Sequence, residues 1–197
     1  MFLHPPLCRF CAKPLRKNLT NICKNCQKKT FPYERLLSIL AYKEPLISLI
    51  HPFKYTNCDY LGKFLSSLMI NRLKKIGFKG YDYDFVTAVP MHKYKLKSRG
   101  YNQAEILGKS LSNYFQIPFQ NDIIYDISIR PQQVKLSFQK RKENIEGAFK
   151  VKKKLKDKKL ILVDDIFTTG STVKACSKAL KDKGAQKITV MTLAKTI

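Results

Sequence analysis

Apolar residues along the chain alternate between short continuous runs and longer segments with helical spacing. Continuous runs predict strands, and spaced apolar positions predict helices. The strands expected in this way are 85–89, 160–163 and 187–194, and 33–43 is apolar and compatible with a strand. The expected helices are 45–76, broken near 56–57, about 102–114, and 171–183. Because strands and helices alternate, we expect an α/β fold with a parallel sheet flanked by helices.

The segment from Leu160 to Thr172 carries the clearest chemistry. An apolar strand leads into Asp164 and Asp165, and a turn of small residues then opens a helix. Backbone N–H groups at such a turn attract a phosphate, hydroxyl side chains add donors, and glycine permits a close approach. The residues predicted to bind a 5-phosphate are Thr168, Thr169, Gly170, Ser171 and Thr172.

Asp164 and Asp165 are predicted to be the catalytic pair. Carboxylates at this position can accept hydrogen bonds from vicinal ribose hydroxyls or hold a hydrated Mg²⁺. The segment lacks the Gly-Lys-Ser/Thr of a Walker A loop and the three glycines of a dinucleotide-binding fingerprint. It resembles instead the type I phosphoribosyltransferase signature, which implies binding of phosphoribosyl pyrophosphate (PRPP). The alternative is an ordinary strand-turn-helix that the acids merely cap.

A cluster of cations follows the predicted strand at 85–89. The loop at 90–103 would lie at the carboxyl end of that strand, where parallel sheets bind ligands. The residues predicted to hold a pyrophosphate leaving group are His92, Lys93, Lys97 and Arg99. The alternative is a solvated charged edge. The polar segment 131–150 is predicted to form a mobile lid over the charged substrate.

Four of the six cysteines form two Cys-x-x-Cys pairs, Cys8 with Cys11 and Cys23 with Cys26. Two such pairs supply four thiolates to one tetrahedral Zn²⁺ and leave no open position, so the zinc is expected to be structural. Disulfides are the alternative, which a reducing compartment disfavours. We predict a zinc-finger module over 1–32 that serves as a folding clip, and a phosphoribosyltransferase-like domain over 33–197. The basic residues of the module suggest nucleic-acid binding as a second role.

The 197 residues include 38 Lys and Arg against 14 Asp and Glu, a formal net charge of +24. Such a charge attracts polyanions, including nucleic acid and phosphorylated small molecules, although a lysine-rich solvated surface gives the same composition. No apolar run approaches membrane-spanning length, and no signal peptide is evident. We therefore expect a soluble, cytoplasmic protein.

Several blocks spread over nearly the whole chain resemble the ComF family of competence proteins. They are the paired Cys-x-x-Cys motifs, Lys54-Tyr55, Pro-x-His-x-x-x-Leu-x-x-Arg-Gly-Tyr-Asn-Gln at 90–103, Gln-x-x-Leu-Ser-x-x-x-Arg-x-x-Asn at 133–144, Ala148-Phe149, and the acid-and-turn motif. Lys95 and Lys97 stand where relatives usually carry arginine. Lysine keeps the charge but lacks the bidentate fork of arginine, so anion contacts there should be less oriented.

The resemblance implies a role in natural transformation. Incoming single-stranded DNA would be handled in the cytoplasm, beside the uptake channel or a competence helicase at the inner face of the cytoplasmic membrane. Three hypotheses follow, namely a phosphoribosyltransferase with an unknown acceptor, a PRPP sensor that has lost transfer, and a DNA-binding factor for which nucleotide is secondary. Transfer would need Mg²⁺ to neutralise the pyrophosphate, and Asp164 and Asp165 to support an oxocarbenium-like transition state.

Overall fold

The computed structural model describes residues 2–16, 20–55, 58–128 and 147–196. Its largest feature is a four-stranded sheet. The strands lie in the order β1 (Arg35–Ala41), β6 (Lys187–Lys195), β5 (Lys159–Phe167) and β2 (Phe85–Ala88), and all neighbours are parallel. The expected α/β fold with a parallel sheet is therefore confirmed, and the segment 33–43 supplies β1.

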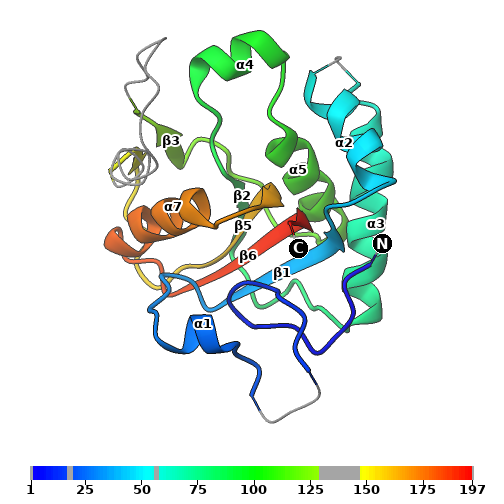
Figure 1. Ribbon diagram of the computed structural model, residues 1–197. Coiled ribbons are helices and arrows are strands. Elements are labelled where there is room, and N and C mark those ends of the chain that lie inside the picture. Colours follow the sequence, from blue (N-terminus) through cyan, green and yellow to red (C-terminus); the bar gives the residue numbers. More distant parts are fainter. Residues whose placement is uncertain (1, 17–19, 56–57, 129–146, 197) are drawn as a thin grey trace, which may run out of the picture.

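Helices cover both faces of this sheet (Figure 1). One face is packed by α2 (Leu46–Tyr55), α3 (Leu61–Lys75) and α5 (Gln103–Phe115), and the other by α7 (Ser171–Asp182). In β5, Leu160 and Leu162 join the core under α7, whereas Ile161 and Val163 join the core under α2, α3 and α5. Burial on both faces explains why this strand is a continuous apolar run.

The predicted loop at 90–103 is wrong in one respect, because it contains a short helix, α4 (Lys93–Arg99). The Nδ1 atom of His92 caps its first turn, and Gly100 ends it in the left-handed conformation at φ 76°. None of the residues of α4 is buried. The helix therefore has no apolar stripe that sequence periodicity could detect.

The motif strand is also longer than predicted, since β5 continues through both acids to Phe167. A separate antiparallel pair joins β3 (Ile124–Asp126) to β4 (Phe149–Val151). Most of the predicted lid, residues 131–146, lies outside the described residues, as does the predicted helix break at 56–57. The end of the predicted lid belongs to β4.

The amino-terminal segment, with α1 (Lys24–Gln27), covers the outer edge of β1. Phe2 forms an antiparallel bridge with Leu40, and the amide of Leu3 donates to the carbonyl of Ile39 at 3.0 Å. Farther along, the amide of Leu36 donates to the carbonyl of Arg9 at 2.8 Å. These bonds pair backbone groups that an open sheet edge would leave exposed.

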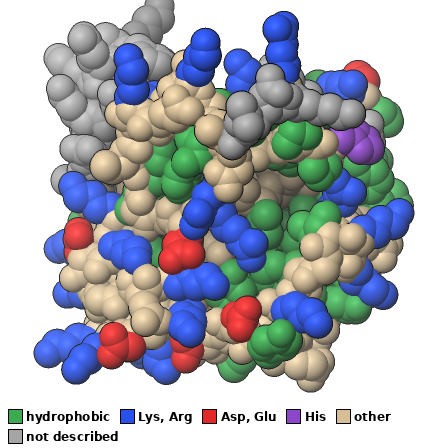
Figure 2. All heavy atoms as spheres, turned by 90° about the horizontal axis from the view of Figure 1, so that it is seen from below, with side chains coloured by type: hydrophobic (Ala, Val, Ile, Leu, Met, Phe, Trp, Pro, Cys, Tyr) green, Lys and Arg blue, Asp and Glu red, His purple; other side chains and the backbone are tan. Residues whose placement is uncertain are grey.

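Across 2–16, 20–55, 58–128 and 147–196, every helix falls short of the length and apolarity that crossing a bilayer requires. Lys and Arg side chains are distributed over the face seen in Figure 2, with a few Asp and Glu among them. Exposed ion pairs such as Lys158 with Asp84 at 2.9 Å neutralise part of this charge. Because Lys and Arg outnumber Asp and Glu by 38 to 14, such pairs leave an excess of cations that attracts anionic partners.

Candidate functional site

A polar hollow lies at the carboxyl end of β5, where the strand turns into α7. The residues that line it are Asp164, Ile166, Phe167, Thr168, Gly170, Ser171, Thr172 and Val173. The helix begins at Ser171 after Gly170, which has no side chain to cap it, and the amide of Ser171 donates weakly to Oγ1 of Thr169 at 3.4 Å. The first-turn amides of α7 lie at this end of the strand. The hollow therefore combines helix N–H groups, hydroxyls and a carboxylate, as a phosphorylated sugar requires.

Gly170 is needed in this turn for two reasons. Its φ is 77°, in the left-handed region that residues with a Cβ avoid. A Cβ at this position would also lie 2.5 Å from Cζ of Phe167, whose ring is buried. The turn brings Thr169 and Ser171 together, with their hydroxyl oxygens 3.0 Å apart.

The two acids differ in their surroundings. Asp164 accepts a hydrogen bond from the amide of Asp165 at 2.8 Å, and Asp165 accepts one from the amide of Ile166 at 2.6 Å. Burial and the neighbouring charge of Asp165 raise the pKa of Asp164 well above its usual range, and Lys54 opposes that shift. A cationic ligand at this position would favour the ionised form of Asp164.

Lys54, in the last turn of α2, approaches Asp165 from the face of the sheet that α2 covers, opposite the face that α7 covers. Its Nζ lies 2.6 Å from Oδ2 of Asp165, and both side chains are largely shielded from water. In the sequence, Lys54 stands out only as part of a family block, and no role was predicted for it. The available signal was a lysine in the last turn of a mainly apolar helix, which by itself does not identify a partner.

The cations predicted to hold pyrophosphate lie on or next to α4. His92 is buried, with its Nε2 2.9 Å from the carbonyl oxygen of Ser128. Arg99 donates to Oε1 of Gln103 at 3.3 Å and stacks on the ring of Tyr55, whereas Lys93 and Lys97 are exposed. Among the described residues, the acids form an ion pair with Lys54 and none with these cations.

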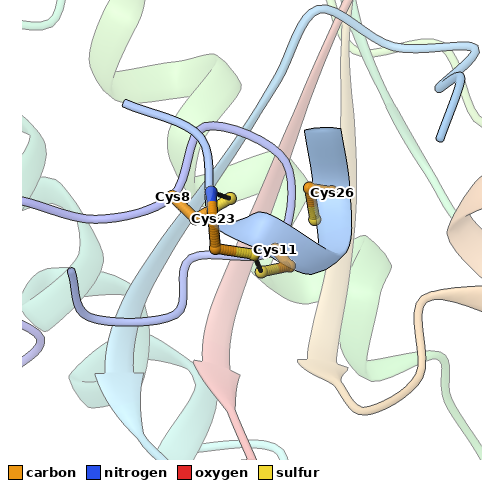
Figure 3. Close-up of side chains that lie close together, drawn as sticks. All are labelled: Cys8, Cys11, Cys23 and Cys26. Carbon is orange, nitrogen blue, oxygen red and sulfur yellow. Dashed lines mark hydrogen bonds between the residues drawn. The ribbon is translucent and has the colours of Figure 1, made fainter. Parts of the chain in front are cut away.

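The second candidate centre is the four-cysteine cluster in the amino-terminal segment, shown in Figure 3. The four sulfur atoms lie within 4.8 Å of one another. Tetrahedral Zn²⁺ with its usual Zn–S length places sulfurs roughly 3.8 Å apart, and those of Cys11 and Cys23 are 3.7 Å apart. The donor set therefore fits zinc, and this separation is far too long for a disulfide.

Backbone amides already stabilise thiolate charge in this cluster. The amide of Cys23 donates to Sγ of Cys8 at 3.3 Å. Burial alone would raise the pKa of the Cys8 thiol, but hydrogen bonds from the backbone of Cys23, Phe10 and Cys11 outweigh burial and lower this pKa to about 7. For Cys11 burial prevails and raises the pKa to about 11. A bound cation would be needed to ionise all four thiols together.

Known proteins are similar to this chain over most of its length. A family model for the phosphoribosyl transferase domain matches residues 101–196. Competence protein F of Haemophilus influenzae is 31% identical over 195 residues, which cover 96% of this chain and 85% of the relative. The chain belongs to the ComF family.

Other relatives of this ComF protein carry related names. DNA utilization protein YhgH of Escherichia coli (strain K12) is 28% identical over 97% of this chain and 85% of its own. Competence protein ComFC of Streptococcus pneumoniae is 25% identical over 94% of this chain and 80% of its own. Among solved structures, a purine phosphoribosyltransferase from Pyrococcus horikoshii Ot3 aligns with a TM-score of 0.41 and 19% identity over 69% of this chain and 74% of that one.

In this ComF protein, one strand, one turn and one helix bring together the predicted acids and the predicted phosphate-binding residues. The cysteines predicted to bind metal also converge. The catalytic, 5-phosphate-binding and pyrophosphate-binding roles all remain predictions, and His92 is already bonded to the carbonyl of Ser128 and to the first turn of α4.

We expect Gly170→Ala to destabilise the protein. The left-handed conformation alone costs about 1–2 kcal/mol for a residue with a Cβ, and the contact with Phe167 adds to this cost. Urea unfolding of Gly170→Ala and Gly77→Ala would separate the two effects, because Gly77 has φ 67° and a Cβ there would meet no other atom within 4 Å. Equal losses in the two variants would contradict the steric argument.

Proposed function

We propose that this ComF protein binds Mg²⁺–PRPP at the carboxyl end of β5 and transfers the phosphoribosyl group to an acceptor. The observation that carries the proposal is the pair Asp164 and Asp165 beside the N-terminus of α7, which follows a turn of glycine and hydroxyl residues. The match of residues 101–196 to the phosphoribosyl transferase domain supports it, because that stretch contains both features.

Different residues of the site bind the 5-phosphate, the ribose and the diphosphate of the ligand. Amides and hydroxyls at 168–172 bind the 5-phosphate. Asp164 and Asp165 accept hydrogen bonds from the ribose hydroxyls and stabilise the positive charge that develops on the ribose as its bond to the diphosphate breaks. Lys93, Lys97 and Arg99 attract the departing diphosphate, and His92 holds α4 in place for them. Asp164 and Asp165 would also hold Mg²⁺, which would neutralise part of the diphosphate charge.

We place this chemistry in natural transformation, where incoming single-stranded DNA is handled. The support is the similarity to a competence protein F, a competence protein ComFC and a DNA utilization protein. A protein that binds PRPP without transferring it is the alternative for the same site. Release of pyrophosphate that depends on an acceptor distinguishes the enzyme from the sensor.

The double substitution Asp164→Asn and Asp165→Asn should weaken binding of Mg²⁺–PRPP at least tenfold. Amides neither hold Mg²⁺ as firmly nor stabilise a cationic transition state, while the strand and its core stay unchanged. Isothermal titration calorimetry with and without Mg²⁺ measures the loss. Asp82→Asn, at an exposed site before β2, is the matched control and should bind as the unmodified protein does. Equal affinity in the double variant would refute the proposed site.

A specific feature of α4 supports contact with single-stranded DNA. Tyr94 is 57% exposed and Tyr55 is 60% exposed, and each carries a cation over its ring, Lys93 at 5.5 Å and Arg99 at 4.9 Å. Exposed aromatic rings with adjacent cations stack on bases and attract phosphates without reading sequence. The surface formed by these four residues, here called the α4 rim, would place a strand next to the proposed PRPP site.

We expect Lys93→Ala with Tyr94→Ala to weaken binding of a labelled single-stranded oligonucleotide severalfold and to reduce its dependence on salt, because a phosphate contact and a stacking contact are lost. Fluorescence anisotropy at two or more salt concentrations measures both effects. The control is Lys79→Ala with Tyr81→Ala, a cation-aromatic pair at the opposite end of β2, with Tyr81 79% exposed. If the control weakens binding as much, the α4 rim is not the DNA surface.

We further propose that Cys8, Cys11, Cys23 and Cys26 bind one Zn²⁺ with a structural role. The convergence of the four sulfurs supports this assignment, and four protein ligands leave no site for a substrate. The amide of Leu3 donates to Ile39 of β1, and the amide of Leu36 in β1 donates to Arg9. Because these bonds join the four-cysteine segment to the sheet, loss of the metal should destabilise the whole fold.

Cys26→Ser should therefore lose zinc and lower the melting temperature. A loss of about 3 kcal/mol corresponds to roughly 6–12 °C for a chain of this size. Elemental analysis and thermal unfolding measure the two effects, and Cys58→Ser, outside the cluster, should retain one zinc per chain. If the unmodified protein contains no zinc and a reducing agent destabilises it to the same extent, disulfides would replace zinc as the explanation.

A further inference from the structure

Lys54 occupies a position that none of the proposed binding roles explains. Its Nζ lies 2.6 Å from Oδ2 of Asp165. The side chain of Lys54 is 18% exposed to solvent, and that of Asp165 is 15% exposed. The other carboxylate oxygen of Asp165 accepts the amide of Ile166. Both oxygens of Asp165 therefore already have a partner. A ribose hydroxyl or a hydrated metal ion at Oδ2 therefore competes with the ammonium group of Lys54 for this oxygen.

The backbone on either side of Lys54 is anchored. The carbonyl of Phe53 accepts hydrogen bonds from the hydroxyl of Tyr101 at 2.7 Å and from Nε2 of Gln103 at 2.9 Å. On the other side, the ring of Tyr55 packs against the guanidinium of Arg99 at 4.9 Å. The end of α2 is thus attached to the segment that joins α4 to α5. Lys54 has a fixed origin and a long flexible side chain, which can exchange one anion for another without moving the helix.

The location of this attachment indicates which part of the ligand Lys54 would meet. The phosphate turn leads into α7, which packs on one face of the sheet, whereas α2 packs on the other. Lys54 approaches Asp165 from the side of α2 and lies next to Arg99 through Tyr55. Arg99 is among the residues proposed to attract the diphosphate, so the nearest anion for a displaced Lys54 is the diphosphate rather than the 5-phosphate.

We propose that Lys54 is a PRPP-binding residue that changes partner, paired with Asp165 in the free protein and with the diphosphate in the complex. The inference rests on the proposed function of the site. It gives Lys54 two opposing effects. The ammonium group competes with the ribose hydroxyls for Asp165, and it adds attraction for any ligand that carries a diphosphate. A ligand without the diphosphate meets only the competition.

This opposition can be measured with two ligands that differ in the diphosphate, Mg²⁺–PRPP and ribose 5-phosphate. In Lys54→Met, the affinity for PRPP should fall at least tenfold, whereas the affinity for ribose 5-phosphate should stay equal or rise severalfold. Isothermal titration calorimetry gives both constants. Lys54→Arg keeps the charge and should recover much of the PRPP affinity. Lys75→Met, an exposed lysine in the last turn of α3, is the matched control and should change neither.

The other outcomes are distinct. Parallel losses for both ligands in Lys54→Met would show a merely structural residue, and tighter binding of both would show a competitor without a role in the complex; either result overturns the inference. Lys54→Gln, which keeps a donor for Asp165 but no charge, gives the same test if the methionine variant unfolds early in a thermal scan. If the unmodified protein binds neither ligand, the proposed function itself fails, whereas binding that is unchanged in both variants refutes only the role of Lys54.

Discussion

The central strand β5 is covered on both faces, and the geometry of the site depends on this constraint. Its alternating residues are shared between two cores, with Leu160 and Leu162 under α7 and Ile161 and Val163 under the other helices. A strand held in this way between β6 and β2 has no freedom to shift its register, because a shift by one residue would exchange the two faces. Asp164 and Asp165 therefore have a fixed position near the carboxyl end of β5, shortly before the turn that starts α7.

The site concentrates negative charge in a protein with a net charge of +24. Two adjacent carboxylates at the end of a buried strand repel each other, and burial adds to the cost, which is why the pKa of Asp164 is raised. Lys54 compensates part of this cost in the free protein. A phosphorylated sugar with a divalent cation matches such a site, since its anionic groups meet helix amides and lysines while the cation and the hydroxyls meet the acids.

The amino-terminal segment contributes in a different way. A parallel sheet of four strands has two edges, and the edge of β1 is occupied by backbone bonds to Leu3, Phe2 and Arg9. The hydroxyl of buried Tyr33 also donates to the carbonyl of Phe10 at 2.8 Å, which connects the four-cysteine segment to the start of β1. The four-cysteine cluster thereby stabilises an amino-terminal segment that is too short to form a hydrophobic core of its own. This segment in turn covers the edge of the sheet at β1.

Local patterns in the sequence were sufficient for the parts of this protein that depend on neighbouring residues. The apolar runs of β5 and β6, the spacing in α5 and α7, the acid-and-turn motif and the paired cysteines all lie within short stretches, where periodicity and residue type decide the outcome. The helix α4 escaped prediction because it buries no side chain and its ends depend on His92 and Gly100. Only the tertiary structure brought Lys54 to Asp165, attached the end of α2 to Tyr101 and Gln103, and paired Leu3 with Ile39. These contacts join residues that are far apart in the chain. Many lysines could pair with Asp165, and many backbone groups could bond to the edge of β1, so the local sequence does not determine which of them do so.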